Sequence, residues 1–228
     1  MRRVFGYDGP LMRVLTKLGD CICASILWLV FSLPIVTIGA SSAALYAAVY
    51  RCIRKDEGGL WRHFRDAFRE NAKRSTLAWL AAGLLMVLLT VDVFVFRSIK
   101  IAGGAFGNFY WVTLVLWCAA LTWIVYLSAY AARFNGSVWE ILRFSFLMLI
   151  LHPIMAAGVL VPAMAALALT LYMPYMIFVA PAAAFWISSV TLEKVFLLHM
   201  RPEDVEKTTH VPQDGWVDSE TEEDADDE

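Results

Sequence analysis

An interrupted apolar segment near the amino terminus constrains the fold more than any other part of this chain. The segment 27–51 is almost wholly apolar, but Pro34 and Gly39 divide it. Proline lacks a backbone N–H and its ring clashes with the carbonyl four residues earlier, so we expect a helix to stop or kink just before Pro34. Ser41 and Ser42 have the side chains of N-cap residues, and they predict that a second helix starts there. In a bilayer, the backbone groups freed at this break must find partners within the protein.

Long apolar runs indicate a membrane protein and not a soluble domain. Hydrophobic residues make up 60% of the 228 residues and charged residues only 18%, whereas a soluble domain is nearer half apolar and a quarter charged. About 20 apolar residues suffice to cross a bilayer as a helix. We expect an all-α, polytopic transmembrane bundle with four full spans, at residues 75–96, 109–132, 144–170 and 175–192. Residues 18–50, which contain most of the interrupted segment, are expected to form either a re-entrant hairpin or two short spans.

Charge is divided between a basic body and an acidic tail. Residues 1–202 hold 18 Lys and Arg against nine Asp and Glu, whereas residues 203–228 hold 12 acidic residues and one lysine. In a membrane protein a basic excess usually reflects cytoplasmic loops, so it does not indicate nucleic-acid binding. By the same rule both termini are cytoplasmic. We expect one transmembrane helical domain over residues 1–201 and an acidic, disordered tail over residues 202–228.

Two basic cytoplasmic segments are predicted to face a partner. Residues about 58–74 form an amphipathic helix, which we expect to lie on the membrane surface and which is also suited to docking a soluble partner. In the second segment, Ser137 and Glu140 have the spacing of a capping box, which predicts a helix from Val138. The candidate docking residues are Arg62, Arg65, Arg69, Asn135, Gly136 and Trp139.

The second half of the interrupted segment has two competing interpretations. Amide groups after the break could point at an anionic ligand, as in transporters with broken helices, which makes Gly39, Ser41 and Ser42 candidate ligand-binding residues. The other interpretation is packing, because small residues recur every four positions from Gly39 and again from Ala40. Such stripes let a neighbouring helix approach closely.

Two ionisable residues inside predicted spans are further ligand-binding candidates. Asp92 lies about one turn from the outer end of its span, and His152 lies near the middle of a span that Pro153 must bend. Each also has a structural interpretation. Asp92 would pair with Arg97 or Lys100, and a neutral His152 would bond a carbonyl freed by Pro153.

The sequence contains no motif that indicates catalysis or metal binding. It lacks a glycine-rich phosphate loop, a GxSxG elbow and an HExxH zinc motif. The four histidines are scattered, and the four cysteines include no CxxC pair. We therefore expect no enzymatic activity, no metal and no cofactor.

Several stretches in about the first third of the chain carry a family likeness: Phe5 with Gly9-Pro10-Leu11, Leu18 with Asp20, Trp28, SLPIVTIGA at 32–40, AALY at 43–46 and FRDAFREN at 64–71. In these stretches the chain resembles the YesL family of bacterial membrane proteins, whose function is unknown. The resemblance implies a bacterial cell membrane and an association with carbohydrate uptake systems of the ABC class. It implies no catalytic residues. Residues 131–137, with Trp139 and Phe144, also look like the coupling loop of ABC importer permeases.

Two function hypotheses remain open. The first is a non-catalytic accessory or regulatory membrane protein, whose small-residue stripes pack against a partner and whose basic segments dock an ABC permease or ATPase subunit. The alternative is a small transporter or permease subunit in its own right, with the broken helix, Asp92 and His152 lining the path. The lipid bilayer is the environment in both, and a homo-oligomer is compatible with either.

Overall fold

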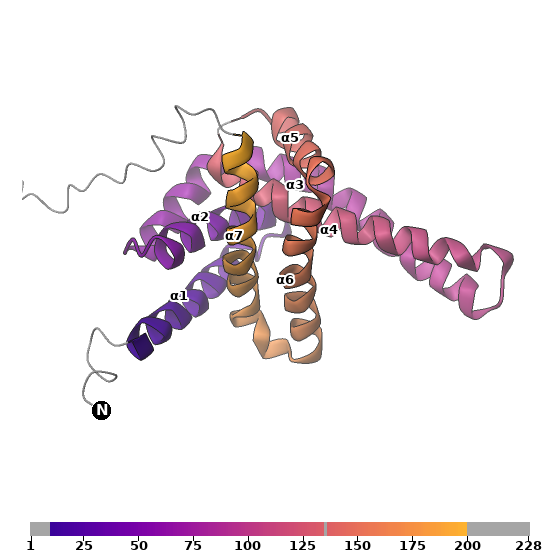
Figure 1. The fold of residues 1–228 in the computed structure, drawn as a ribbon, viewed down its shortest axis with the longest axis horizontal. Coiled ribbons are helices and arrows are strands. Elements are labelled where there is room, and N and C mark those ends of the chain that lie inside the picture. The colour runs from indigo at the N-terminus through magenta and orange to yellow at the C-terminus, as the bar shows by residue number, and fades with distance from the viewer. Residues whose placement is uncertain (1–9, 135, 200–228) are drawn as a thin grey trace, which may run out of the picture. The chain divides into compact units, whose positions relative to one another are not determined.

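All regular structure in the described part of the chain is helical, which confirms the all-α prediction. The structure is a computed structural model that describes residues 10–134 and 136–199. Residues Met1–Val195 form one compact unit, and Phe196–Glu228 form a second, of which only the end of the last helix is described. Within these described residues the α-helices are α1 (Pro10–Phe31), α2 (Ile38–Ala48), α3 (Leu60–Ile101), α4 (Phe109–Arg133), α5 (Val138–Leu151), α6 (Pro153–Tyr172) and α7 (Ala180–His199) (Figure 1).

The predicted break before Pro34 is present, and the Thr37 hydroxyl binds the Phe31 carbonyl at the end of α1. Helix α1 ends at Phe31, and a short 3-10 helix, η1 (Ile35–Thr37), leads into α2. The Thr37 hydroxyl oxygen lies 2.6 Å from the Phe31 carbonyl oxygen and 2.7 Å from the Pro34 carbonyl oxygen, so its single proton is shared between these two acceptors. The predicted start of the second helix is wrong, because α2 begins at Ile38. Ser41 and Ser42 therefore lie inside α2 and do not cap it.

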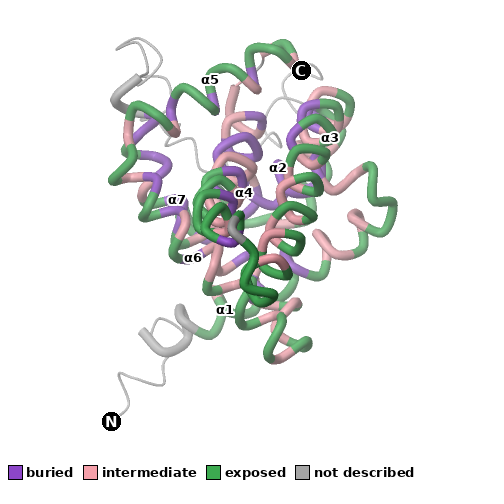
Figure 2. Tube along the Cα trace, turned by 90° about the vertical axis from the view of Figure 1, so that its right-hand side faces the viewer, coloured by how far each residue is buried: buried purple, intermediate pink, exposed green. Residues whose placement is uncertain are grey.

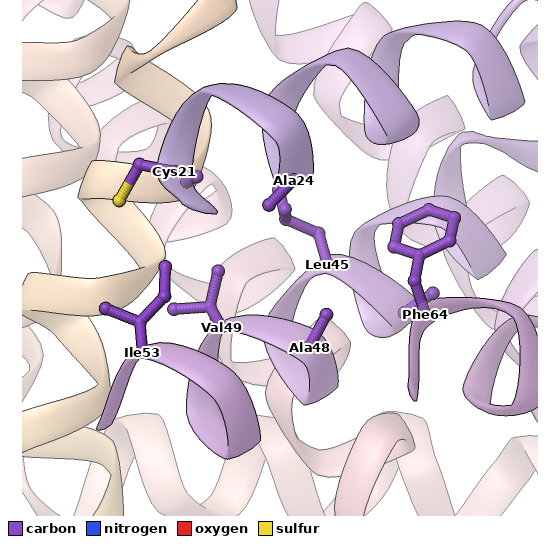
Figure 3. Close-up of a cluster of buried hydrophobic side chains, with 9 residues drawn as sticks. Cys21, Ala24, Leu45, Ala48, Val49, Ile53 and Phe64 are labelled. Carbon is purple, nitrogen blue, oxygen red and sulfur yellow. The ribbon is translucent and has the colours of Figure 1, made fainter. Parts of the chain in front are cut away.

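Helix α2 is the buried centre of the first unit. Nine of its 11 residues are buried, and Figure 2 shows α2 mainly in the colour of buried residues. One side of α2 packs against α1, where Cys21 and Ala24 meet Leu45, Ala48 and Val49 (Figure 3). After Ala48 the helix widens into a π-helix, η2 (Val49–Arg54), before the turn to α3.

The other side of α2 packs against α3 and α4 at very short range. Ala43 meets Ala78, Ala82 and Leu127 there. A Cβ atom at Gly39 would overlap the Cβ of Trp79. The packing interpretation of the small residues is thus confirmed. The hypothesis that they pack against a separate partner is wrong, because helices of this chain already occupy both sides of α2.

Helix α3 is longer than either sequence segment from which it is made. It runs for 42 residues, about 63 Å at 1.5 Å per residue. The amphipathic helix predicted over about 58–74 begins at Leu60, but it continues through Arg74 and Ser75 into the span without an interruption. Its expected arrangement as a separate surface helix is therefore wrong. Phe64 and Asn71 are buried on one face, and arginines are exposed on the other.

Among the residues that the structure describes, four helical segments are long and apolar enough to cross a membrane, by length and composition: Ile35–Arg54, Leu60–Ile101, Phe106–Arg133 and Pro153–Tyr172. The last three overlap the predicted spans 75–96, 109–132 and 144–170, and the first overlaps the second half of the interrupted segment. The predicted span 175–192 falls in a 3-10 helix, η4 (Pro174–Phe178), and in α7, which is not among the four. The predicted span 144–170 is divided into α5 and α6, which meet at His152.

Candidate functional site

A cluster of charged and aromatic side chains joins α2, α4 and α7. Glu193 of α7 is only 4% exposed. The Tyr46 hydroxyl donates to one carboxylate oxygen of Glu193 at 3.0 Å, and the Arg133 guanidinium pairs with the other. A buried carboxylate is tolerated only when it is paired and hydrogen-bonded, and here both oxygens have a partner. We call Tyr46, Tyr50, Arg133 and Glu193 the Glu193 cluster.

Cations surround the Tyr50 ring at the edge of the Glu193 cluster. The guanidinium carbons of Arg133 and Arg54 lie 5.4 and 5.8 Å from the ring centroid, and the Lys55 ammonium lies 5.3 Å from it. These are distances at which an aromatic face attracts a cation. Arg54 also donates to the Ser189 carbonyl of α7 at 2.6 Å. Together with Arg54 and Lys55, the Glu193 cluster holds three cations and one carboxylate, so this region is electropositive, and it links three helices.

Sequence reasoning missed the Glu193 cluster. Arg133 and Glu193 are 60 residues apart, and each follows an apolar span, where a charge normally marks the start of a cytoplasmic loop. The π-helix at Val49–Arg54 places Tyr50 in the cluster and Arg54 beside it, and such helices often occur at functional sites. No sequence signal identified the π-helix. The common position of both charges at span ends is the only hint that the sequence offers.

The structure assigns the predicted residues of the interrupted segment to helix packing. The Ser41 hydroxyl donates to the Trp28 carbonyl at 2.9 Å, and the Ser42 hydroxyl accepts from the Trp28 indole at 3.1 Å. Both serines therefore bind α1. Gly39 faces α3, where a Cβ atom would lie 2.7 Å from the Ser75 carbonyl oxygen. The ligand-binding role of these three residues stays a prediction.

Asp92 and His152 lie on different elements and are not brought together with the residues of α2. Asp92 is exposed on α3 and forms no ion pair with any residue that the structure describes. The predicted partner Lys100 instead places its ammonium 4.1 Å from the centroid of the Trp111 ring. His152 occupies the junction of α5 and α6. The proposed path lined by Asp92 and His152 thus gains no support.

The structure connects the two basic segments that were predicted to dock a partner. Arg74 of α3 donates to the Gly136 carbonyl of the α4–α5 loop at 3.4 Å. The capping box predicted at Ser137 and Glu140 is present, so α5 begins at Val138 as expected. Trp139 is 71% exposed. Asn135 lies outside the described residues.

Three arginines of α3 form one exposed face. Arg62, Arg65 and Arg69 are all exposed, and their spacing of three and four residues places them on the same side of the helix. The carboxylate oxygens of Asp66 lie 3.9 Å from Nε of Arg62 and 3.3 Å from Nη2 of Arg65. Arg69 forms no ion pair within the described part of the chain. We call these three residues the arginine face.

Two apolar grooves of about 530 Å³ lie between the helices of the first unit. One lies between α4, α5 and α6, and its lining includes Cys118, Thr122 and Pro153. The other lies between α3, α4 and α5, and Arg143 is its one charged lining residue. Neither Asp92 nor His152 lines either groove.

One comparison with known proteins gives a match. A family described as "Protein of unknown function, DUF624" matches residues 21–93, about a third of the chain. Over these residues the chain is similar to that family. No curated protein and no solved structure matches the chain.

The matched residues form the packing unit around α2. They include the second half of α1, the break, all of α2, and α3 as far as Val93. Gly39 and the two serines that bind Trp28 lie inside the match, whereas Arg133 and Glu193 lie outside it. The similarity to this family therefore concerns the helical scaffold and assigns no activity.

Proposed function

We propose that this protein is a non-catalytic integral membrane protein of the bacterial cell membrane, with both termini in the cytoplasm, that acts as an accessory or regulatory component of a carbohydrate uptake system of the ABC class. The observation that carries the proposal is the arginine face, an exposed basic surface on a helix that continues directly from a membrane span. The resemblance to the YesL family supports the class of partner.

The length of α3 supports a position of the arginine face beyond the apolar part of the helix. The apolar part of the helix, residues 75–96, is about 33 Å long, close to the 30 Å thickness of the hydrocarbon core. Residues 60–74 extend it by about 22 Å. One face of this extension packs within the chain at Phe64, so the arginine face on its other side is left to meet a partner.

The side chains of the arginine face support a role in recognition more than in folding. The opposite face of the same segment carries Phe64 and Asn71, which are buried within this chain. The arginines are exposed, and Asp66 offsets only part of their charge. Guanidinium groups bind carboxylates in a planar, bidentate geometry. The fitting partner surface is therefore acidic.

Affinity purification from native membranes tests the proposal. Tagged protein solubilised in a mild detergent should recover a permease or ATPase subunit in stoichiometric amount. The triple variant Arg62→Gln, Arg65→Gln, Arg69→Gln should lose that subunit, whereas Arg97→Gln, an exposed arginine at the other end of α3, should retain it. A triple lysine variant at the same three positions keeps the positive charge but not the guanidinium geometry, so it shows which of the two the partner requires. Recovery of the wild-type protein alone, or only as copies of itself, contradicts the proposal.

A further inference from the structure

The groove between α3, α4 and α5 is lined mainly by apolar side chains. Ala81 and Leu85 of α3 line it, together with Trp123 of α4 and the α5 residues Leu142, Phe146 and Ile150. The Trp123 indole donates to the Ser145 hydroxyl at 3.0 Å, so the one polar group of the Trp123 side chain is already satisfied. The Trp123 side chain therefore has no donor left for a ligand, and the other residues named here are apolar.

One end of this groove is polar. Trp139 and Arg143, one turn apart on α5, also line it. Both are exposed, and Arg143 forms no ion pair with another described residue. Tryptophan and arginine side by side are typical of the headgroup level of a bilayer, where the indole sits at the interface and the guanidinium meets phosphate.

The length of the groove matches one leaflet. From Trp139 to Ile150, α5 rises by about 16 Å, and half of the hydrocarbon core is about 15 Å thick. The polar end lies next to the α4–α5 loop, on the side that the basic residues predict to be cytoplasmic. The cytoplasmic leaflet carries anionic lipid.

We propose that this groove binds an anionic phospholipid, with one acyl chain against Trp123 and Phe146 and the phosphate at Arg143. The charge of Arg143 favours the anionic headgroup, and the apolar interior favours the chain. An acyl chain is thin enough to lie inside the groove.

Native mass spectrometry of the purified protein tests this site. In detergent with equal amounts of phosphatidylglycerol and phosphatidylcholine, the wild type should retain mainly phosphatidylglycerol. Arg143→Gln should lower this preference about fivefold, the effect of one basic residue near an anionic surface. Arg97→Gln, at the other end of α3, should not change it. An unchanged preference in Arg143→Gln overturns the proposal.

Variants that fill the groove test the position of the acyl chain. Ala81→Phe should reduce retention of both lipids, whereas Leu84→Phe, on the exposed side of α3, should not. If Ala81→Phe does not elute as a single species in size-exclusion chromatography, Ile150→Trp replaces it at the far end of the groove. Unchanged lipid retention in the filled variant, or loss of a bound protein instead of lipid, overturns the site. Because these measurements use the purified chain alone, they do not depend on the proposed uptake complex.

Discussion

Helix α2 and the apolar part of α3 show that hydropathy and burial are separate properties in this molecule. The apolar window of α3 is the more hydrophobic of the two, yet only 11% of it is buried, against 61% for the segment that contains α2. Lipid solvates an apolar side chain as well as protein does, so hydrophobicity does not drive a helix into the centre of a bundle. What distinguishes α2 is the size and polarity of its side chains.

Small residues and hydroxyls give α2 the contacts that α3 lacks. Gly39 and Ala43 allow α3 to approach, and the hydroxyls of Ser41 and Ser42 bind α1. The apolar part of α3 presents branched and aromatic side chains to its surroundings. Substitutions around α2 should therefore destabilise the fold strongly, and substitutions on the exposed side of α3 should not.

The largest effect is expected from breaking the charge pair beside α2. Arg133→Gln leaves the buried Glu193 carboxylate with Tyr46 as its remaining hydrogen-bond partner in the cluster. An uncompensated buried charge costs about 3–5 kcal/mol. Denaturant unfolding in mixed micelles should record a loss of that size.

A double variant shows whether that loss belongs to the pair. Adding Glu193→Gln to Arg133→Gln removes the stranded charge, so the double variant should be more stable than Arg133→Gln alone. Additive losses in the two single variants would mean that the residues are not coupled.

A smaller loss is expected when α2 is pushed away from α3. Gly39→Ala places a Cβ atom against the Trp79 side chain and the Ser75 carbonyl, and overpacking of this kind costs about 1–3 kcal/mol. Gly19→Ala is the matched control, because a Cβ at Gly19 meets nothing within 4 Å. That change should be neutral or stabilise α1 by up to ~1 kcal/mol. Equal thermal unfolding temperatures for the two variants would contradict the close approach.

A third change removes one hydrogen bond between α2 and α1. Ser42→Ala deprives the Trp28 indole of its acceptor, and side-chain hydrogen bonds between membrane helices average about 0.6 kcal/mol. Ser98→Ala is the control, since that hydroxyl donates only to the Phe94 carbonyl of its own helix. The Ser42 variant should unfold at a lower denaturant concentration than the Ser98 variant, and the reverse order would exclude this bond as a contributor.

Signals contained in a few neighbouring residues were sufficient to predict three of the helix boundaries. The break before Pro34, the capping box at Ser137 and the interruption at Pro153 each follow from one backbone restriction or one local hydrogen bond. The start of α2 was misplaced because the hydroxyl that binds the Phe31 carbonyl belongs to Thr37, which lies four residues before Ser41.

Features that depend on distant residues could not be predicted in this way. The continuity of α3 through Arg74 was missed because a charged amphipathic segment and an apolar span are equally good helices, and composition does not show whether they share an axis. The pair of Arg133 with Glu193 depends on how α4 and α7 pack, so only the structure reveals it. Of the candidate site, the sequence provided the arginine face but not the Glu193 cluster.

The smallest effect is expected on the exposed side of α3, and it tests the comparison most directly. Leu84 is 64% exposed there, so Leu84→Ala opens no cavity and should change the free energy of unfolding by less than about 0.5 kcal/mol. The same substitution at Leu45, which is fully buried in α2, should cost about 2–5 kcal/mol. Denaturant unfolding of both variants in one lipid and detergent mixture measures the two changes in the free energy of unfolding under the same conditions. If Leu84→Ala costs as much as Leu45→Ala, the exposed side of α3 is covered by protein and not by lipid, and the contrast between the two helices disappears.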